Sequence, residues 1–258
     1  MTPGLDDKIV VFAGPSLPPE SRPSNPAFEW RAPAIAGDAY ALGDARPRAV
    51  VLIDGLFDDW PAIRHKELLH LVGLGIPVIG GASMGALRAA ELHRFGMIGV
   101  GRIFAAFAAG RLDADDEVAV LHGPAGLDWA SLTEPLVNVR ATLLSAARQR
   151  ILDFAAARGL LEAARAMFYK ERTWQTLLGR PAVRAEIAGG RLGVFERWLP
   201  HGYVDLKRID ALSCLEAALA LAGAAPPAAI APETLFALAL SDQVVAGLMP
   251  GPESLARR

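Results

Sequence analysis

Residues 76–95 read IPVIGGASMGALRAAELHRF, and this stretch decides the fold of the N-terminal half. It begins with a short apolar run, Ile76 to Gly80, which predicts a buried strand. The glycines of Gly81–Gly85 then predict a sharp turn, and the alanine-rich residues after it are typical of a helix reaching roughly Phe95. The stretch is therefore a strand, a turn and a helix in direct succession.

Two earlier apolar runs, Lys8 to Ala13 and Ala49 to Gly55, have the continuous hydrophobicity of parallel strands that are covered on both faces. A helix from about Pro61 to Leu74 separates the second run from the strand at Ile76, and the proline-rich stretch between the two runs predicts an irregular, partly packed loop. Strands that alternate with helices over residues 8–95 predict a parallel sheet with right-handed crossovers.

After about Ala130 the hydrophobic period becomes helical, and Ser131 to Glu134 matches a capping box at a helix start. The expected fold is α/β: a small, mostly parallel sheet flanked by helices in the N-terminal half, followed by a mainly helical C-terminal half. We expect an α/β domain over residues 1–128 that carries the serine turn, and a helical domain over residues 129–258. Further helices are predicted near 133–150, 150–169, 171–179, 181–188, 206–222 and 232–248.

The overall composition argues against several partner classes. The chain has 258 residues with 26 basic and 28 acidic side chains, which gives no basic surface for nucleic acid or an anionic membrane. No apolar stretch reaches the roughly 20 residues that a membrane span needs. The one cysteine, Cys214, lies among apolar residues at helical spacing and is expected to be a buried thiol. We expect a soluble cytoplasmic protein.

The pattern G-x-S-x-G at Gly81–Gly85 carries the strongest chemical signal. Glycines on both sides allow a strained turn that presents Ser83 as a nucleophile, with the backbone N–H groups of Met84 and Gly85 placed to stabilise an oxyanion. The alternative interpretation is that Ser83 only caps the following helix. Both interpretations remain open on the motif alone.

A serine nucleophile needs a base, and the histidines are poorly placed for this role. His93 is too near on the same helix, while no later strands are predicted to carry His122 and His201. Lys66, on the helix that precedes the serine strand, is the other option, provided that its amine is neutral. An ordinary solvated helix lysine is the competing interpretation.

Other polar and glycine residues follow the predicted strands and should meet Ser83, because sites in parallel sheets lie beyond the carboxyl ends of the strands. Arg88 and Glu91, on the helix after Ser83, pair with each other or fix the turn to neighbouring loops. No nucleotide-binding motif is present, and the acidic run from Asp113 to Glu117 predicts a polar loop rather than a metal site, so no cofactor or metal is expected. The residues expected to line the site are Gly14, Ser16, Asp54, Gly55, Gly81, Arg88 and Glu91. For Asp54, a helix or turn cap is the competing interpretation.

Several of these segments together resemble the TfuA-like family. The resemblance covers roughly residues 8–140 and is carried mainly by the run SMGALRAAEL, which begins at Ser83, and by the preceding strand with IDG at 53–55. The segments Asp115–Val118, Glu134–Asn138 and Asp205–Ala211 extend it.

The resemblance implies a role beside YcaO enzymes, which use ATP to activate peptide backbone amides, in exchanging amide oxygen for sulfur. It implies that the protein releases sulfur from a thiocarboxylated, ThiS-like carrier through a Ser–Lys pair, and that it helps YcaO to engage the precursor peptide. Matched residue by residue, the serine of SMGALRA is Ser83 and the lysine of the HKE motif at 65–67, within the run Ile63–Leu69, is Lys66. Two alternatives remain: a non-catalytic YcaO partner that promotes peptide binding, and an unrelated serine esterase.

Overall fold

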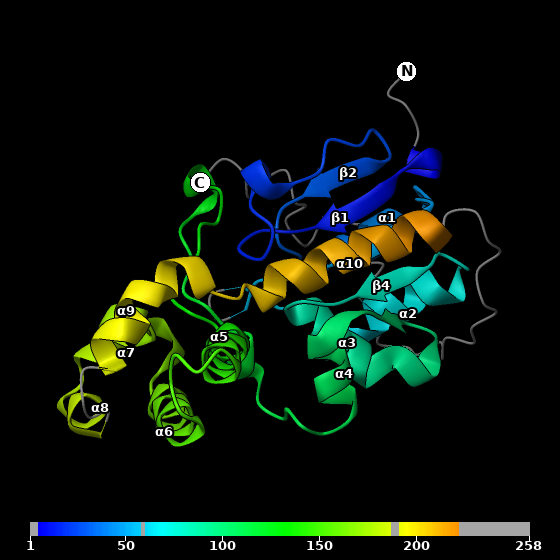
Figure 1. The fold of residues 1–258 in the computed structure, drawn as a ribbon. Coiled ribbons are helices and arrows are strands. Elements are labelled where there is room, and N and C mark those ends of the chain that lie inside the picture. Colours follow the sequence, from blue (N-terminus) through cyan, green and yellow to red (C-terminus); the bar gives the residue numbers. More distant parts are fainter. Residues whose placement is uncertain (1–4, 58–59, 187–190, 222–258) are drawn as a thin grey trace.

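The computed structural model describes residues 5–57, 60–186 and 191–221, and it contains one five-stranded sheet in the N-terminal half (Figure 1). All neighbouring strands are parallel, in the order β2-β1-β3-β4-β5. The predicted α/β class, with a mainly helical second half, is confirmed. The strands are β1 (Ile9–Phe12), β2 (Phe28–Arg31), β3 (Ala49–Leu52), β4 (Val78–Gly80) and β5 (Ile98–Gly99).

The two faces of the sheet are buried by different helices, as the continuous apolar runs require. Val10 and Phe12 of β1 pack into a core with α1 (Asp38–Gly43), α2 (His65–Gly73) and α3 (Met84–Leu92). Ile9 and Val11 point to the opposite face, which α10 (Leu206–Leu221) covers through the side chains of Ala211, Cys214, Leu215 and Ala218. Figure 1 shows α10 running across this face of the sheet. The predicted burial of Cys214 is confirmed.

The remaining helices of the second half form a bundle with its own core, built around residues such as Leu143, Leu160 and Phe195. These helices are α5 (Leu136–Arg148), α6 (Phe154–Arg165), α7 (Trp174–Gly179), α8 (Pro181–Glu186) and α9 (Arg191–Gly202), and α4 (Gly101–Ala108) contacts both α3 and α10. The domain boundary near residue 128 stays a prediction. Helix α10 belongs to the C-terminal half of the sequence but packs on the sheet of the N-terminal half.

Several expectations about individual elements were wrong. The proline-rich stretch contains strand β2, which pairs with β1 at the sheet edge, where flanking prolines do not interrupt a ladder. Helix α2 begins at His65 rather than near Pro61. The capping box does not start a helix, because α5 begins at Leu136, after Pro135. The helix predicted at 232–248 lies outside the described residues. Over the described part of the chain, none of the helices combines the length and the apolar character that crossing a membrane demands.

Helix α3 packs so closely on β3 that Gly85 tolerates no side chain. A Cβ at Gly85 would overlap the carbonyl oxygen of Leu52, which is backbone and cannot rotate away. Gly85→Ala is therefore expected to lower the free energy of unfolding by about 3 kcal/mol, although alanine favours helices intrinsically. Gly126→Ala is the matched control, since nothing lies near its Cβ position. Urea unfolding of both variants checks this, and equal midpoints would contradict the close packing.

Candidate functional site

The ends of β1 and β3 are joined by the carboxylate of Asp54, which is 3% exposed. Its Oδ2 accepts hydrogen bonds from the N–H groups of Gly14 (2.8 Å) and Ser16 (3.0 Å). Its Oδ1 accepts a hydrogen bond from the Ser16 hydroxyl at 2.6 Å. A buried carboxylate with three donors holds the loop after β1 against the end of β3, so these two segments meet at one edge of the sheet.

Ser83 occupies a sharp turn between β4 and α3. Ala82 before it has φ = 64°, a left-handed value that costs energy for a residue with a Cβ, and Ser83 itself has φ = −124° and ψ = −121°. The Ser83 N–H donates to the carbonyl of Gly81 at 2.8 Å, which closes the turn. Ser83 stands at the N-cap position, but its hydroxyl makes no capping hydrogen bond. The capping interpretation therefore does not account for this side chain.

The two backbone donors predicted for an oxyanion differ in their availability. The Gly85 N–H donates to the carbonyl of Ile53 at 3.1 Å, so it is already engaged in joining α3 to β3. The Met84 N–H makes no hydrogen bond within the described residues, and it lies at the N-terminus of α3, where the helix dipole favours negative charge. The Met84 amide is thus the better placed of the two.

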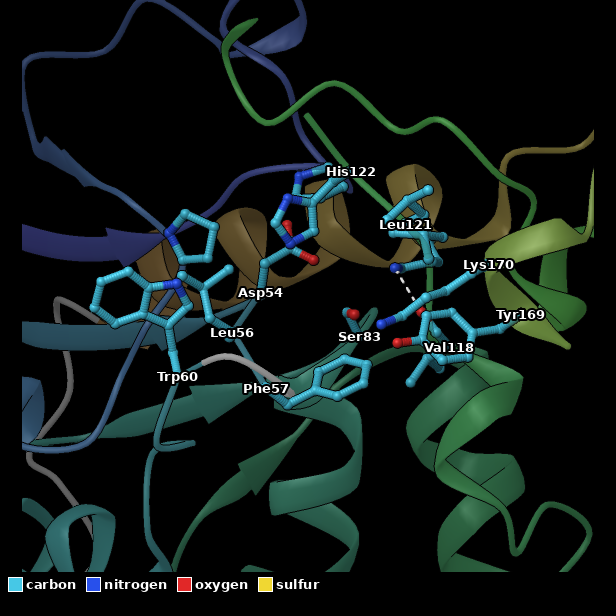
Figure 2. Close-up of a pocket in the computed structure, with 15 residues that line it drawn as sticks. Asp54, Leu56, Phe57, Trp60, Ser83, Val118, Leu121, His122, Tyr169 and Lys170 are labelled. Atoms are coloured by element: carbon cyan, nitrogen blue, oxygen red, sulfur yellow. Dashed lines mark hydrogen bonds between the residues drawn. The ribbon is translucent and has the colours of Figure 1, made fainter. Parts of the chain in front are cut away.

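Ser83 lines a small cavity of about 140 Å³ beyond the strand ends, shown in Figure 2. Asp54 and Gly55 form part of its wall, and the opposite wall comes from the segment after α4 and from Tyr169 and Lys170. The rings of Phe57 and Tyr169 lie 6.0 Å apart and connect the two walls. The cavity is therefore formed jointly by the sheet edge and the helical half.

A second, larger groove of about 480 Å³ adjoins this cavity, and Ser83, Gly55 and Phe57 line both. Arg88 and Glu91 of α3 also line the groove. Arg88 pairs with Glu91, because its Nη1 donates to Glu91 Oε2 at 2.8 Å. Arg88 also contacts a neighbouring loop, because its Nε donates to the carbonyl of Ile63 at 3.1 Å, so the two predicted roles are both present. Ser83 thus lies where the smaller cavity meets the larger groove.

The predicted site residues Gly14, Ser16 and Gly81 support this edge rather than line the Ser83 cavity. Gly14 and Ser16 hold Asp54, as described above. A Cβ at Gly81 would overlap the Cys214 sulfur, so this glycine allows α10 to pack against the turn.

Lys66 lies in the first turn of α2, is partly exposed, and lines neither the cavity nor the groove. Its neighbour His65 contacts α3 through Glu91, with His65 Nε2 and Glu91 Oε2 2.7 Å apart. At 1.5 Å per residue, Glu91 is about 12 Å along α3 from Ser83. The structure therefore brings the start of α2 to the other end of α3, and it does not bring Lys66 into the cavity with Ser83.

Two lysines that the sequence analysis did not single out do line the Ser83 cavity, namely Lys170 and Lys207. Lys170 extends toward Ser83 in Figure 2. Lys207, in the first turn of α10, is 3% exposed, and its Nζ donates to the carbonyl of Val118 at 2.9 Å. Burial lowers the pKa of Lys207, while the carboxylates of Asp54 and Asp205 oppose the shift.

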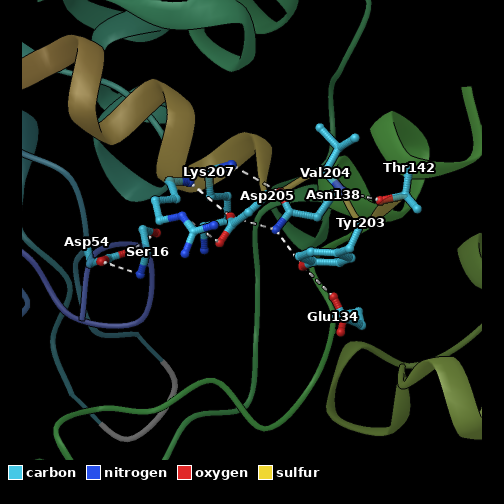
Figure 3. Close-up of polar contacts among 10 residues, drawn as sticks. Ser16, Asp54, Glu134, Asn138, Thr142, Tyr203, Val204, Asp205 and Lys207 are labelled. Carbon is cyan, nitrogen blue, oxygen red and sulfur yellow. Dashed lines mark hydrogen bonds and ion pairs between the residues drawn. The ribbon is translucent and has the colours of Figure 1, made fainter. Parts of the chain in front are cut away.

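A polar network fixes the start of α10 against α5 (Figure 3). The Asn138 side chain donates to Asp205 Oδ1 (3.0 Å) and to the Tyr203 hydroxyl (2.9 Å), and it accepts from the backbone N–H of Lys207 (3.0 Å). The Tyr203 hydroxyl donates to Glu134 at 2.7 Å. Residues from Glu134–Asn138 and Asp205–Ala211 thus act together to position Lys207.

The acidic run after α4 is tied to the helical half. Asp116 pairs with the fully buried Arg172 at 2.9 Å, and Glu117 pairs with Arg140 at 2.6 Å. These ion pairs fix the segment that contributes Val118 to the cavity wall.

The buried amine of Lys207 is expected to make stability rise with pH in the alkaline range. Between its lowered folded-state pKa and its ordinary value of 10.5, the unfolded chain binds more protons than the folded one. The free energy of unfolding of the wild type should therefore rise with pH over this window relative to Lys207→Met. Urea titrations of both proteins at several pH values measure the difference, and parallel curves would contradict it.

Comparison with known proteins yields one family. Residues 54–173 match a family model described as TfuA-like protein. The matched segment begins at Asp54 and includes Lys66, Ser83 and Lys170, whereas Lys207 lies beyond it. No curated protein matches the chain.

Proposed function

Because residues 54–173 belong to the TfuA-like family, we propose that this protein acts in peptide-backbone thioamidation as a hydrolase. Its substrate is a thiocarboxylated ThiS-like carrier protein, from which it releases sulfide for a partner YcaO enzyme. The reaction takes place in the cytoplasm. The observation that carries the proposal is the position of Ser83: an uncapped hydroxyl on a strained turn, at the wall of a cavity and at the N-terminus of a helix.

The turn supplies the groups that thiocarboxylate hydrolysis needs. The Ser83 oxygen attacks the carbonyl carbon, and the negative charge that develops on the oxygen is stabilised by the Met84 N–H and the α3 dipole. The carbon–sulfur bond breaks, hydrosulfide leaves, and water then hydrolyses the acyl-enzyme. A lysine amine serves as base in this scheme, and Lys66 is the lysine that the family motif predicts.

The shape of the site suits a flexible protein tail. The larger groove beside α3 accepts the extended tail of the carrier, and the smaller cavity holds its reacting end next to Ser83. The aromatic side chains of Phe57, Trp60 and Tyr169 line the cavity and limit the access of water.

The second candidate is a non-catalytic YcaO partner that promotes binding of the precursor peptide, and the two roles can coexist in one protein. The test is to incubate the purified protein with thiocarboxylated carrier and to follow free sulfide together with the carrier's mass. Sulfide release that requires Ser83 supports the hydrolase. Enhanced peptide binding to YcaO without any sulfide release favours the partner role, and turnover of simple esters without carrier favours an esterase.

A further inference from the structure

We infer that Lys207 is the general base for Ser83, an assignment that rests on the proposed function and replaces Lys66 in that role. Lys207 belongs to the last described helix, outside the family-matched segment, and lines the cavity. It would remove the proton from the Ser83 hydroxyl and later from the hydrolytic water.

The first argument is placement. Ser83 and Lys207 both line the cavity of about 140 Å³, which is the smaller of the two hollows that Ser83 borders. A general base exchanges a proton with its partner directly or through one water, and both routes run through a cavity that the two groups share. Lys66 lines neither the cavity nor the adjoining groove.

The second argument is rigidity. The backbone N–H of Lys207 is held by Asn138, and its Nζ is held by the carbonyl of Val118. Asp205 also accepts a hydrogen bond from the N–H of Arg208 at 3.0 Å and so caps the same helix turn. Because both the backbone and the amine of Lys207 are held by hydrogen bonds, its side chain is positioned before the substrate binds, as a general base requires.

The third argument is protonation. A lysine accepts a proton only when its amine is neutral, and burial favours the neutral form of Lys207. The charged and titratable groups around it are Asp54 at the end of β3, Asp205 at the start of α10, and His122 and Lys170 on the other cavity walls. The two carboxylates favour the protonated form and oppose the effect of burial, which is the largest of these influences.

Ser83, Lys207, the thiocarboxylate and one water account for every bond and proton in the reaction. Neutral Lys207 takes the Ser83 proton as the Ser83 oxygen bonds to the thiocarboxylate carbon. The ammonium then returns that proton to sulfur as the carbon–sulfur bond breaks, which releases hydrosulfide and leaves an ester on Ser83. Lys207 next takes a proton from water as the water oxygen attacks the ester, and it returns this proton to the Ser83 oxygen. The products are the carrier carboxylate, hydrosulfide and one proton released to solvent.

The test compares Lys207→Arg and Lys207→Ala with Arg197→Met, which removes an exposed cation of α9 and is the matched control. Arginine keeps the positive charge but cannot act as a base at neutral pH. Two readouts are used: sulfide release from the thiocarboxylated carrier, and labelling of Ser83 by a fluorophosphonate probe, which requires no carrier. Melting temperatures confirm that the variants fold.

We expect both rates to fall by about 10²- to 10⁴-fold in the two Lys207 variants and to stay near wild type in Arg197→Met. Added ethylamine should partly restore Lys207→Ala, with a rate that follows the fraction of neutral amine as pH changes. A purely structural role of Lys207 would not produce that pH dependence.

Retention of both rates in a folded Lys207→Arg variant would overturn the inference, as would loss of both in Lys66→Ala alone. If the wild type labels at Ser83 but releases no sulfide, the proposed function fails while labelling still tests Lys207. A wild type that neither labels nor releases sulfide overturns both.

Discussion

Ser83→Ala is expected to lower the rate of sulfide release from the thiocarboxylated carrier by about 10³-fold or more, because it removes the atom that bonds to the substrate. The fold should be almost unchanged. The Ser83 hydroxyl makes no capping hydrogen bond, so its loss leaves no buried partner unsatisfied. Sulfide assays at saturating carrier, with melting curves of the same samples, measure both quantities.

Ser24→Ala is the matched control, since Ser24 is exposed and lies away from the strand ends. YcaO binding by the Ser83 variant should equal that of the wild type, because the substitution alters no surface charge. Sulfide release that persists in a folded Ser83→Ala protein would eliminate the nucleophile and leave the non-catalytic partner as the better proposal.

Asp54→Ala is expected to have the largest effect on stability, a loss of roughly 3–5 kcal/mol in the free energy of unfolding. The substitution leaves the N–H groups of Gly14 and Ser16 and the Ser16 hydroxyl without their acceptor in a buried place. It also removes one of the two carboxylates that favour the charged form of Lys207. The loop after β1 should therefore detach from the end of β3.

Asp113→Ala provides the comparison, because Asp113 is an exposed carboxylate that also borders the groove. Guanidinium unfolding and hydrogen exchange at Gly14 and Ser16 measure the effect of each change. An Asp54→Ala protein as stable as Asp113→Ala, with Gly14 and Ser16 still protected, would show that the three hydrogen bonds are not what holds this edge together.

The strands that were predicted correctly are those whose residues are apolar throughout, which indicates burial on both faces of the sheet. β1, β3 and β4 are continuous apolar runs, and only a strand covered on both faces needs such a run. β2 reads FEWR between prolines and was missed, because at the edge of a sheet the pairing partner rather than hydrophobicity determines the strand. The capping box failed since Glu134 is used by Tyr203 instead of by a helix start.

The sequence predicted only the part of the candidate site that is formed by residues close together in the chain. The turn around Ser83 is encoded within five residues, and the close packing of Gly81 and Gly85 explains why glycine stands on both sides. The approach of Lys207 is different, because it depends on where α10 docks. An apolar helix has the same pattern whether it covers a sheet or joins a bundle, so no spacing in the sequence relates position 207 to position 83.

The docking of α10 on the sheet also has a consequence for folding during synthesis. Chains emerge from the ribosome N-terminus first, so β1, β3 and β4 are available long before the helix that shields Ile9, Val11 and Val51. Until α10 has been synthesised to residue 221, the apolar face of the sheet that this helix covers is exposed to water. We expect the nascent chain to bind chaperones during this interval. The cavity beside Ser83 is therefore completed late in translation, because Lys207 of α10 forms part of its wall.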